Sequence, residues 1–370
     1  MNIRYTAIPR PKASGENPFT VAAAEAARSF HSTLPGYAPT PLVTLRALAS
    51  RLGIGSISIK DESRRFNLDA FKSLGASFAM NALANGRSAL TFVTATDGNH
   101  GRGVAWAARL FGHRAVVYMP KGSSPERLEN IRALGAAAEI TELSYDDCVR
   151  YASRMAEENG WILIQDTDFD GYYDVPRLIM QGYTTMGIEI RDAWNGPPPT
   201  HIFLQAGVGA MAGAMSGFFA DLYGEARPTV VIVEPTGADC IYRTAAAGDG
   251  QYHVCRELNT IMAGLSCGEV CTVAYDILSR HADYVVACPD SVSKTGMRLL
   301  SHPEFGDDAV ISGESGAVCA GLVFELMTSR ELAELRARLS LNDASRVLCI
   351  STEGATDKAV FEEITGISPV

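Results

Sequence analysis

The stretch from 90 to 190 alternates short apolar runs with longer segments of helical periodicity, and this alternation restricts the possible folds more than any other feature. The apolar runs have the length of buried strands. They lie at 90–93, 115–119, 138–140 and 162–164. The periodic segments between them predict helices at about 101–111, 125–134 and 145–159. Strands that alternate with helices pair in parallel through crossovers. The pattern therefore predicts an α/β fold with a mostly parallel, twisted sheet.

A second series of the same kind follows a proline-rich linker at 195–199. It predicts strands at 201–205, 230–234, 284–287 and 347–350, and a helix at 210–223. Upstream, the pattern predicts helices at 21–30, 45–52 and 73–83 and a short strand at 57–59. Five prolines among the first forty residues predict that the rest of that segment is irregular. We expect two domains, each with a mostly parallel sheet flanked by helices: a large one from 1–84 and 191–370, and a small one from 85–190.

The composition excludes several classes of protein. The 370 residues carry a net charge of -10, with a pI near 5.3, which argues against nucleic acid or an anionic membrane as the main partner. The eight cysteines are scattered, and the closest pair, Cys267 and Cys271, has no histidine cluster beside it, so we expect no metal site. No apolar run is long enough to span a membrane, and the first residues lack the apolar core of an export signal. We expect a soluble, cytoplasmic protein.

The segment from 63 to 76 places a lysine in an apolar setting. Lys72 follows Phe71 and precedes Leu74-Gly75-Ala76. Burial disfavours the charged form of a lysine and so lowers its pKa. A neutral lysine can form a Schiff base with an aldehyde. A single lysine is more often a solvated residue on a helix surface, so the functional interpretation depends on the motifs downstream.

A glycine-rich loop, Gln205-Ala-Gly-Val-Gly-Ala-Met-Ala-Gly213, lies between a predicted strand and a predicted helix. Glycines let the backbone approach an anion, and a helix N-terminus supplies unpaired N–H groups and a positive dipole end. The loop therefore predicts a phosphate site, with a ligand-free packing turn as the alternative. Its glycine spacing differs from the G-x-G-x-x-G fingerprint, and no ribose-binding acid stands at the expected distance, which argues against an NAD-linked dehydrogenase.

The sequence Thr-Asp97-Gly-Asn99-His100-Gly follows another predicted strand. The amide of Asn99, between two glycines, suits a phenolic or carboxylate oxygen. Asp97 can equally be a helix cap. His100 is either a buried structural histidine or a catalytic one.

Polar residues also end two further strands. Ser351 and Thr352 follow the last apolar strand, where their hydroxyls suit a ring nitrogen or cap a helix. Asp166 follows Gln165 at the end of the strand at 162–164. Because ligands bind at the carboxyl ends of parallel strands, we expect these side chains to share a cleft.

In this order, the motifs resemble those of the pyridoxal-phosphate enzymes of fold type II, the group of tryptophan synthase β and threonine dehydratase. The resemblance narrows to the diaminopropionate ammonia-lyase family and runs from about residue 35 to 357. The segments that carry it are Ala-Phe-Lys72, Thr-Asp97-Gly-Asn-His-Gly-Arg-Gly-Val-Ala-Trp106, Tyr-Met-Pro-Lys-Gly122, Met180-Gln-Gly-Tyr183, the glycine-rich loop, Glu-Pro235, Asp-Cys-Ile-Tyr-Arg243, Thr-Ile-Met-Ala-Gly-Leu265, Ile-Ser-Gly-Glu-Ser-Gly-Ala317 and Ser-Thr-Glu-Gly354.

The resemblance implies pyridoxal 5'-phosphate as the cofactor, held in the large domain. The implied cofactor-binding residues are Lys72, Asn99, Gly207, Val208, Gly209, Ala210, Met211 and either Ser351 or Thr352. The implied catalytic residues are Lys72, Asp97 and Asp166. Lys72 would hold the cofactor covalently and act as one base at Cα, and Asp97 would be the base for the other enantiomer. Asp166 would lie near the substrate's amino group.

The implied reaction is the α,β-elimination of D- or L-2,3-diaminopropionate to pyruvate and ammonia by a homodimer. Two departures from the family pattern fall near the presumed substrate pocket: Asp168-Phe169 stands where Ala-Trp is common, and Ala355 where an acid is common. The alternative is therefore the same chemistry on serine, threonine or another β-substituted alanine. A regulator that kept the fold without the chemistry is a further alternative, and it would have no need of Lys72.

Overall fold

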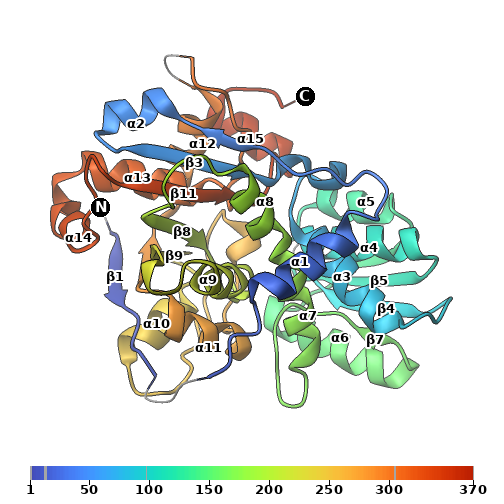
Figure 1. The fold of residues 1–370 in the computed structure, drawn as a ribbon. Helices are drawn as coiled ribbons and strands as arrows, with labels where there is room; N and C mark the ends of the chain where they lie inside the picture. Colours follow the sequence, from blue (N-terminus) through green and yellow to red (C-terminus); the bar gives the residue numbers. More distant parts are fainter. Residues whose placement is uncertain (1, 12–14, 97, 304–305, 370) are drawn as a thin grey trace.

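The computed structural model describes residues 2–11, 15–96, 98–303 and 306–369. Within these residues the strands form a larger sheet of seven and a smaller sheet of four, which lie in separate halves of the molecule (Figure 1). The larger sheet runs, in spatial order, β1 (Arg4–Ala7), β10 (Tyr284–Cys288), β9 (Thr229–Pro235), β8 (His201–Gln205), β11 (Arg346–Ser351), β3 (Ser56–Asp61) and β2 (Leu42–Thr44). The smaller sheet runs β6 (Ala137–Ile140), β5 (Arg114–Met119), β4 (Thr91–Ala95) and β7 (Ile162–Leu163).

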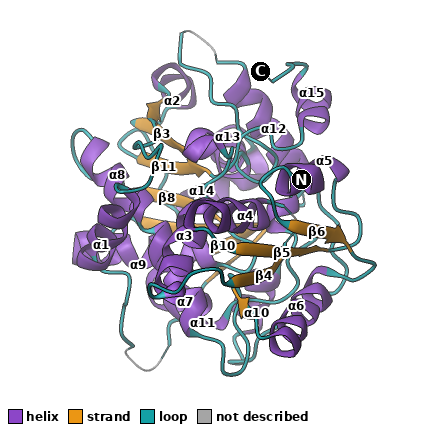
Figure 2. Cartoon of the chain, turned by 90° about the vertical axis from the view of Figure 1, so that its right-hand side faces the viewer, coloured by secondary structure: helices purple, strands orange, loops and turns teal. Residues whose placement is uncertain are grey.

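Helices flank both sheets. They are α1 (Val21–His31), α2 (Arg46–Leu52), α3 (Lys72–Ala84), α4 (Asn99–Phe111), α5 (Pro125–Arg132), α6 (Tyr145–Asn159), α7 (Asp174–Tyr183), α8 (Thr185–Ala193), α9 (Ala210–Tyr223), α10 (Cys240–Ala247), α11 (Thr272–His281), α12 (Asp290–Ser301), α13 (Val318–Thr328), α14 (Ala333–Arg338) and α15 (Lys358–Thr365). Four short 3-10 turns join them: η1 (Glu62–Asn67), η2 (Gly224–Ala226), η3 (Ala263–Leu265) and η4 (Arg330–Leu332). On the smaller sheet, α4 and α5 lie on one face and α6 on the other (Figure 2).

Strand direction confirms the predicted fold class. Every pairing in the smaller sheet is parallel, and so are the central pairings of the larger sheet, from β10 to β3. Only the edge strands β1 and β2 run antiparallel, among the described residues. The parallel strands are apolar because helices cover both of their faces. In β9, for example, all but the first residue are buried.

The sequence prediction was wrong about the first forty residues, where it expected no strand. Residues Arg4–Ala7 form β1, which pairs antiparallel with β10. The strand is only four residues long and none of its side chains is fully buried, so it lacks the apolar run that identifies the central strands. Its pairing partner, β10, lies far away in the sequence. An edge strand of this kind is recognised only once the sheet beside it exists.

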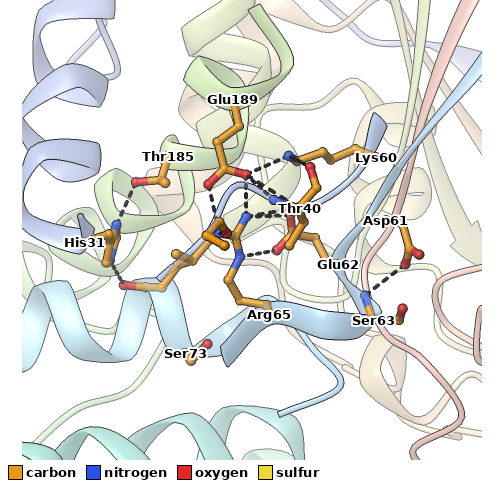
Figure 3. Close-up of polar contacts among 12 residues, drawn as sticks. His31, Thr40, Lys60, Asp61, Glu62, Ser63, Arg65, Ser73, Thr185 and Glu189 are labelled. Atoms are coloured by element: carbon orange, nitrogen blue, oxygen red, sulfur yellow. Dashed lines mark hydrogen bonds and ion pairs between the residues drawn. The ribbon is translucent and has the colours of Figure 1, made fainter. Parts of the chain in front are cut away.

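A cluster of four buried charges joins the larger sheet to the helices beside it (Figure 3). Glu189 of α8 accepts hydrogen bonds from Lys60 at 2.6 Å and from Arg65 at 2.6 Å, and Arg65 also binds Glu62 at 2.8 Å. All four side chains are at most 1% exposed. Burial alone would raise the pKa of Glu189, yet the hydrogen bonds and charges of Arg65 and Lys60 hold it well below its usual value. Glu189 therefore stays charged, and the four side chains are paired in the interior.

The buried charges anchor a strained turn. Directly after Arg65, the residues Phe66, Asn67 and Asp69 have φ angles of 52°, 57° and 53°. Side chains other than glycine seldom adopt this left-handed region, which costs on the order of 1 kcal/mol or more per residue. Surrounding contacts must impose such a backbone. This turn leads straight into α3, whose first residue is Lys72.

Candidate active site

A cavity lies at the carboxyl ends of strands from both sheets, as expected for parallel strands that bind ligands. It encloses about 730 Å³, part of it open to solvent, within the usual range of ligand pockets of about 300–1,000 Å³. The residues that line it include Lys72 at the start of α3, Thr96, Asn99 and His100 around the start of α4, Asp166 after β7, Gly207 to Met211 between β8 and α9, Leu265, Cys267, and Thr352 and Glu353 after β11.

Lys72 is the amine of this cavity. Its Nζ forms an ion pair with Asp166, which lies 94 residues further along the chain. The aromatic rings of Phe71 and Tyr183 lie 5.5 Å and 5.9 Å from Nζ. The side chain of Lys72 is 19% exposed, so a molecule in the cavity can reach it. The sequence predicted Lys72 and Asp166 as candidate site residues but not that the two pair, and it did not predict that Tyr183 lies beside the amine.

Asp166 is a carboxylate in the described structure. Its burial would raise the pKa, but the charge and hydrogen bond of Lys72 and the nearby His100 lower it to about 2. The carboxylate thus remains charged across the physiological range and keeps the amine of Lys72 in place at the cavity wall.

The loop between β8 and α9 has the properties of an anion site. Among the residues that the structure describes, none accepts a hydrogen bond from the backbone N–H of Gly207, Val208, Gly209, Ala210 or Met211. All five residues line the cavity. Gly209 has a φ of 101° and precedes α9, which has neither a side-chain cap nor an acidic residue in its first turn. Unpaired amides at an uncapped helix N-terminus bind phosphate well.

Replacement of Gly207 by alanine should weaken phosphate-group binding at this loop about tenfold, which corresponds to about 1.4 kcal/mol. A Cβ at this position would lie 3.0 Å from Cys267 Sγ and 3.2 Å from Leu265 Cα, so the loop must shift. Gly213→Ala is the matched control, because its Cβ would be equally crowded, 3.0 Å from Met180 Cε, but Gly213 lies outside the cavity lining. Titration of each apoprotein with pyridoxal 5'-phosphate measures the effect. Equal weakening in both variants would contradict a role for the backbone N–H groups of this loop in phosphate binding.

The two candidate hydroxyls after β11 differ in position. Thr352 lines the cavity, and its Oγ1 accepts a hydrogen bond from Gln205 Nε2 at 2.9 Å. Ser351 is 1% exposed, and its hydroxyl donates to Ser312 Oγ at 2.8 Å, away from the cavity lining. The alternation of side chains along a strand sends neighbours to opposite sides. Of the two, Thr352 is therefore the one that a ligand can contact.

Asn99 begins α4 and its Nδ2 donates to Glu353 Oε2. Glu353 in turn accepts the backbone N–H of Ser315 at 2.9 Å through Oε1. The sequence prediction gave Glu353 no role. The available signal was its place directly after Thr352, at the end of a buried strand. This contact links the small-sheet side of the cavity to the large-sheet side.

A buried ion pair also connects the small-sheet side of the molecule to the large-sheet side. Arg127 of α5 binds Glu314 Oε1 at 2.6 Å, and the two side chains are 8% and 3% exposed. Burial and the nearby Glu353 carboxylate raise the pKa of Glu314 to about 7, against the charge of Arg127. The sequence offered no sign of this pair, since its members lie 187 residues apart.

His100 and Asp97 complete the predicted set. His100 is buried and Nε2 donates to the carbonyl of Ile164 at 2.9 Å, which leaves Nδ1 as the acceptor nitrogen. Burial lowers its pKa, so the ring is neutral. Asp97 lies outside the described residues. No group of three or more possible metal ligands occurs among the described residues. In the same part of the chain, no helix has the length and apolar character needed to span a membrane.

The polar groups of this cavity match those of pyridoxal 5'-phosphate. Lys72 suits the aldehyde, and the unpaired backbone N–H groups of residues 207–211 suit the phosphate. The amide of Asn99 and the hydroxyl of Thr352 suit the ring between them. The family model described as "Pyridoxal-phosphate dependent enzyme" matches residues 33–353, and the chain belongs to this family. The cofactor is therefore pyridoxal phosphate, and the fold is that of fold type II.

The chain is also closely similar to individual proteins within this family. The chain is 47% identical to diaminopropionate ammonia-lyase of Salmonella typhimurium over 363 residues. This match covers 91% of this chain and 90% of that protein. The crystal structure of diaminopropionate ammonia-lyase from Escherichia coli in complex with D-serine matches with a TM-score of 0.92 at 41% identity, over 98% of this chain and 96% of that one. Threonine deaminase from Solanum lycopersicum, 20% identical with a TM-score of 0.77 over 98% of this chain and 97% of that one, shares the fold.

Proposed function

We propose that the protein is a carbon–nitrogen lyase that catalyses the α,β-elimination of D- and L-2,3-diaminopropionate. The reaction consumes one water and releases pyruvate and two molecules of ammonia. The observation that carries the proposal is the 47% identity to a diaminopropionate ammonia-lyase over 91% of the chain. The cavity supports it, because Lys72 and the unpaired backbone N–H groups of residues 207–211 line the same space.

The described residues fit the cofactor. Lys72 would hold it through the ε-amino group, and the amides of residues 207–211 would bind its phosphate. Asn99 would donate to the ring oxygen and Thr352 would face the pyridine nitrogen, with Ser351 behind it. When bound, the cofactor supplies an electron sink for the negative charge left at Cα. A neutral hydroxyl beside the pyridine nitrogen favours a less protonated ring than a carboxylate would, which favours loss of a β-leaving group over transamination.

The protein's own acids and bases carry the protons. Lys72 would remove the Cα proton of one enantiomer once the substrate amine has displaced it. Asp166, next to Lys72, would stabilise the resulting ammonium and lie near the substrate's amino group. Asp97, two residues before Asn99 in the sequence, would serve as the base on the opposite face.

Replacement of Asp97 by asparagine should lower turnover of the D substrate by about 10²-fold or more, because general base catalysis contributes about 10²–10⁴. Turnover of the L substrate should be largely preserved, since Lys72 remains. Pyruvate release from each enantiomer measures the two rates in one preparation. An equal loss for both would remove the two-base assignment.

Pyruvate release from a panel of D and L amino acids tests the substrate. We expect 2,3-diaminopropionate to give the highest kcat/KM. The alternative is a dehydratase that prefers serine, threonine or another β-substituted alanine, and it is favoured by the changes at Asp168-Phe169 and Ala355. A higher kcat/KM for serine or threonine would establish that alternative.

We further propose a homodimer in the cytoplasm, with domains from 1–84 and 191–370 and from 85–190. All strands of the smaller sheet fall within 85–190, which supports that division. The eight cysteines, all among the described residues, are free thiols, which suits a reducing compartment. Light scattering of the purified protein would measure the subunit number.

A further inference from the structure

Helices α3 and α7 pack unusually closely next to the reactive lysine. A Cβ on Gly75 of α3 would lie 2.5 Å from the ring of Tyr183, and one on Gly182 of α7 would lie 2.6 Å from the carbonyl of Leu74. Neither position tolerates a side chain. The contact fixes the ring of Tyr183 against Phe71, with ring centres 4.7 Å apart. Tyr183 is thus held beside Lys72 by the packing of the backbone itself.

The hydroxyl of Tyr183 makes no well-formed hydrogen bond in the described structure. Tyr183 is 0% exposed and its Oη lacks a hydrogen bond of ordinary geometry in the described structure, although the side chain of Lys72 lies close enough to act on the phenol as a donor. Burial raises the pKa of this phenol, although the charge of Lys72 opposes the shift, so the group is neutral. A buried hydroxyl whose hydrogen bonding is incomplete is unfavourable. Phenylalanine would fill the same space without this cost.

Tyr172 provides the contrast. Its hydroxyl donates to the carbonyl of Leu163 at 3.0 Å and accepts the N–H of Gln165 at 2.9 Å. Here the phenol satisfies two backbone groups and has an evident structural role. The hydroxyl of Tyr183 has no such role in the described structure.

We propose that Tyr183 is a positioning residue for Lys72, an inference that rests on the proposed function. A neutral lysine amine has two hydrogens and one lone pair. With one N–H donated to Asp166 and the other to Tyr183 Oη, the lone pair points away from both acceptors and into the cavity, where Cα of the substrate lies. The phenol oxygen acts on the lysine and does not touch the reacting carbon.

Replacement of Tyr183 by phenylalanine should lower kcat for the L substrate about tenfold or more, with KM changed less than twofold. The D substrate should lose less than threefold, because its proton leaves on the other face. Tyr223→Phe, on α9 and outside the cavity lining, is the control and should leave both rates unchanged. A purely structural phenol would make both enantiomers fall together, and that result would overturn the inference.

Two measurements do not depend on turnover. The midpoint of thermal unfolding of the Tyr183→Phe apoprotein should equal or exceed that of the wild type, whereas Tyr172→Phe should lower it.

The second measurement is the rate at which pyridoxal 5'-phosphate attaches to the apoprotein, monitored by absorbance after rapid mixing. Attachment to Tyr183→Phe should be about tenfold slower, with the same final amount bound. An unchanged attachment rate, or a midpoint lowered as in Tyr172→Phe, would also overturn the inference. If the wild type released no pyruvate, the proposed function would fail, and the attachment rate would still test Tyr183.

Discussion

Replacement of Lys72 by arginine should lower the rate of pyruvate release by at least about 10³-fold, and the purified variant should be colourless. Arginine keeps a positive charge next to Asp166, so the buried carboxylate retains a partner and the fold should persist. A guanidinium, however, does not form a Schiff base and does not lose its proton in the physiological range. Under the roles proposed for Lys72, both the covalent anchor and the base for Cα are then lost, and a single general base alone contributes about 10²–10⁴.

Mass spectrometry after borohydride reduction checks this prediction directly. The wild-type protein should carry the added mass of the reduced cofactor on the peptide that contains Lys72, and the Lys72→Arg variant should not. Lys358→Arg, on the exposed face of α15, is the control and should keep both the colour and the activity. A Lys72→Arg variant that retained the added mass at another lysine would refute the assignment of the anchor.

Replacement of Arg65 by methionine should lower the free energy of unfolding by about 3–5 kcal/mol, the usual cost of removing one partner from a buried ion pair. Methionine resembles the aliphatic part of arginine, so little volume is lost. What remains is two buried carboxylates, Glu62 and Glu189, with Lys60 as their only cation in the cluster. The left-handed turn that follows Arg65 also loses its anchor.

Urea denaturation of the variants measures the effect. Arg338→Met is the control, because the Arg338–Glu334 pair is exposed and its loss should leave the midpoint unchanged. The double variant Arg65→Met with Glu62→Gln removes one charge of each sign and should recover part of the lost stability. If Arg65→Met lowered the urea midpoint no more than Arg338→Met does, the four charges would not form a buried ion-pair cluster that stabilises the fold.

Local sequence patterns were sufficient for much of the fold. The strand His201–Gln205 and the helix Ala210–Tyr223 were predicted with the bounds that the structure has, because an apolar run, a glycine turn and a helical period follow one another without interruption. The central strands were predicted to within about two residues for the same reason. The edge strand Arg4–Ala7 was missed because its pattern is too short and too polar to stand out.

The candidate site followed from the sequence only in part. The position of Lys72, the glycine-rich loop and the polar residues at strand ends could be predicted, since each is a local motif whose chemistry does not depend on the rest of the chain. The choice between Ser351 and Thr352 could not, because it depends on which side of β11 faces the cavity. The bond between Asn99 and Glu353 likewise depends on how the two sheets are placed.

The sequence by itself thus determined the fold class, because the alternation of strand and helix patterns is local. The cofactor, and Lys72 as its proposed anchor, followed from the resemblance of the motifs to a known family. The tertiary structure alone decided which groups surround that amine. Asp166 and Tyr183 reach Lys72, and Glu189 reaches Lys60 and Arg65, across 94 to 129 residues of chain. Such partners are set by strand order and helix packing, and the charge state and geometry of a buried group follow from its partners in space rather than from its neighbours in sequence.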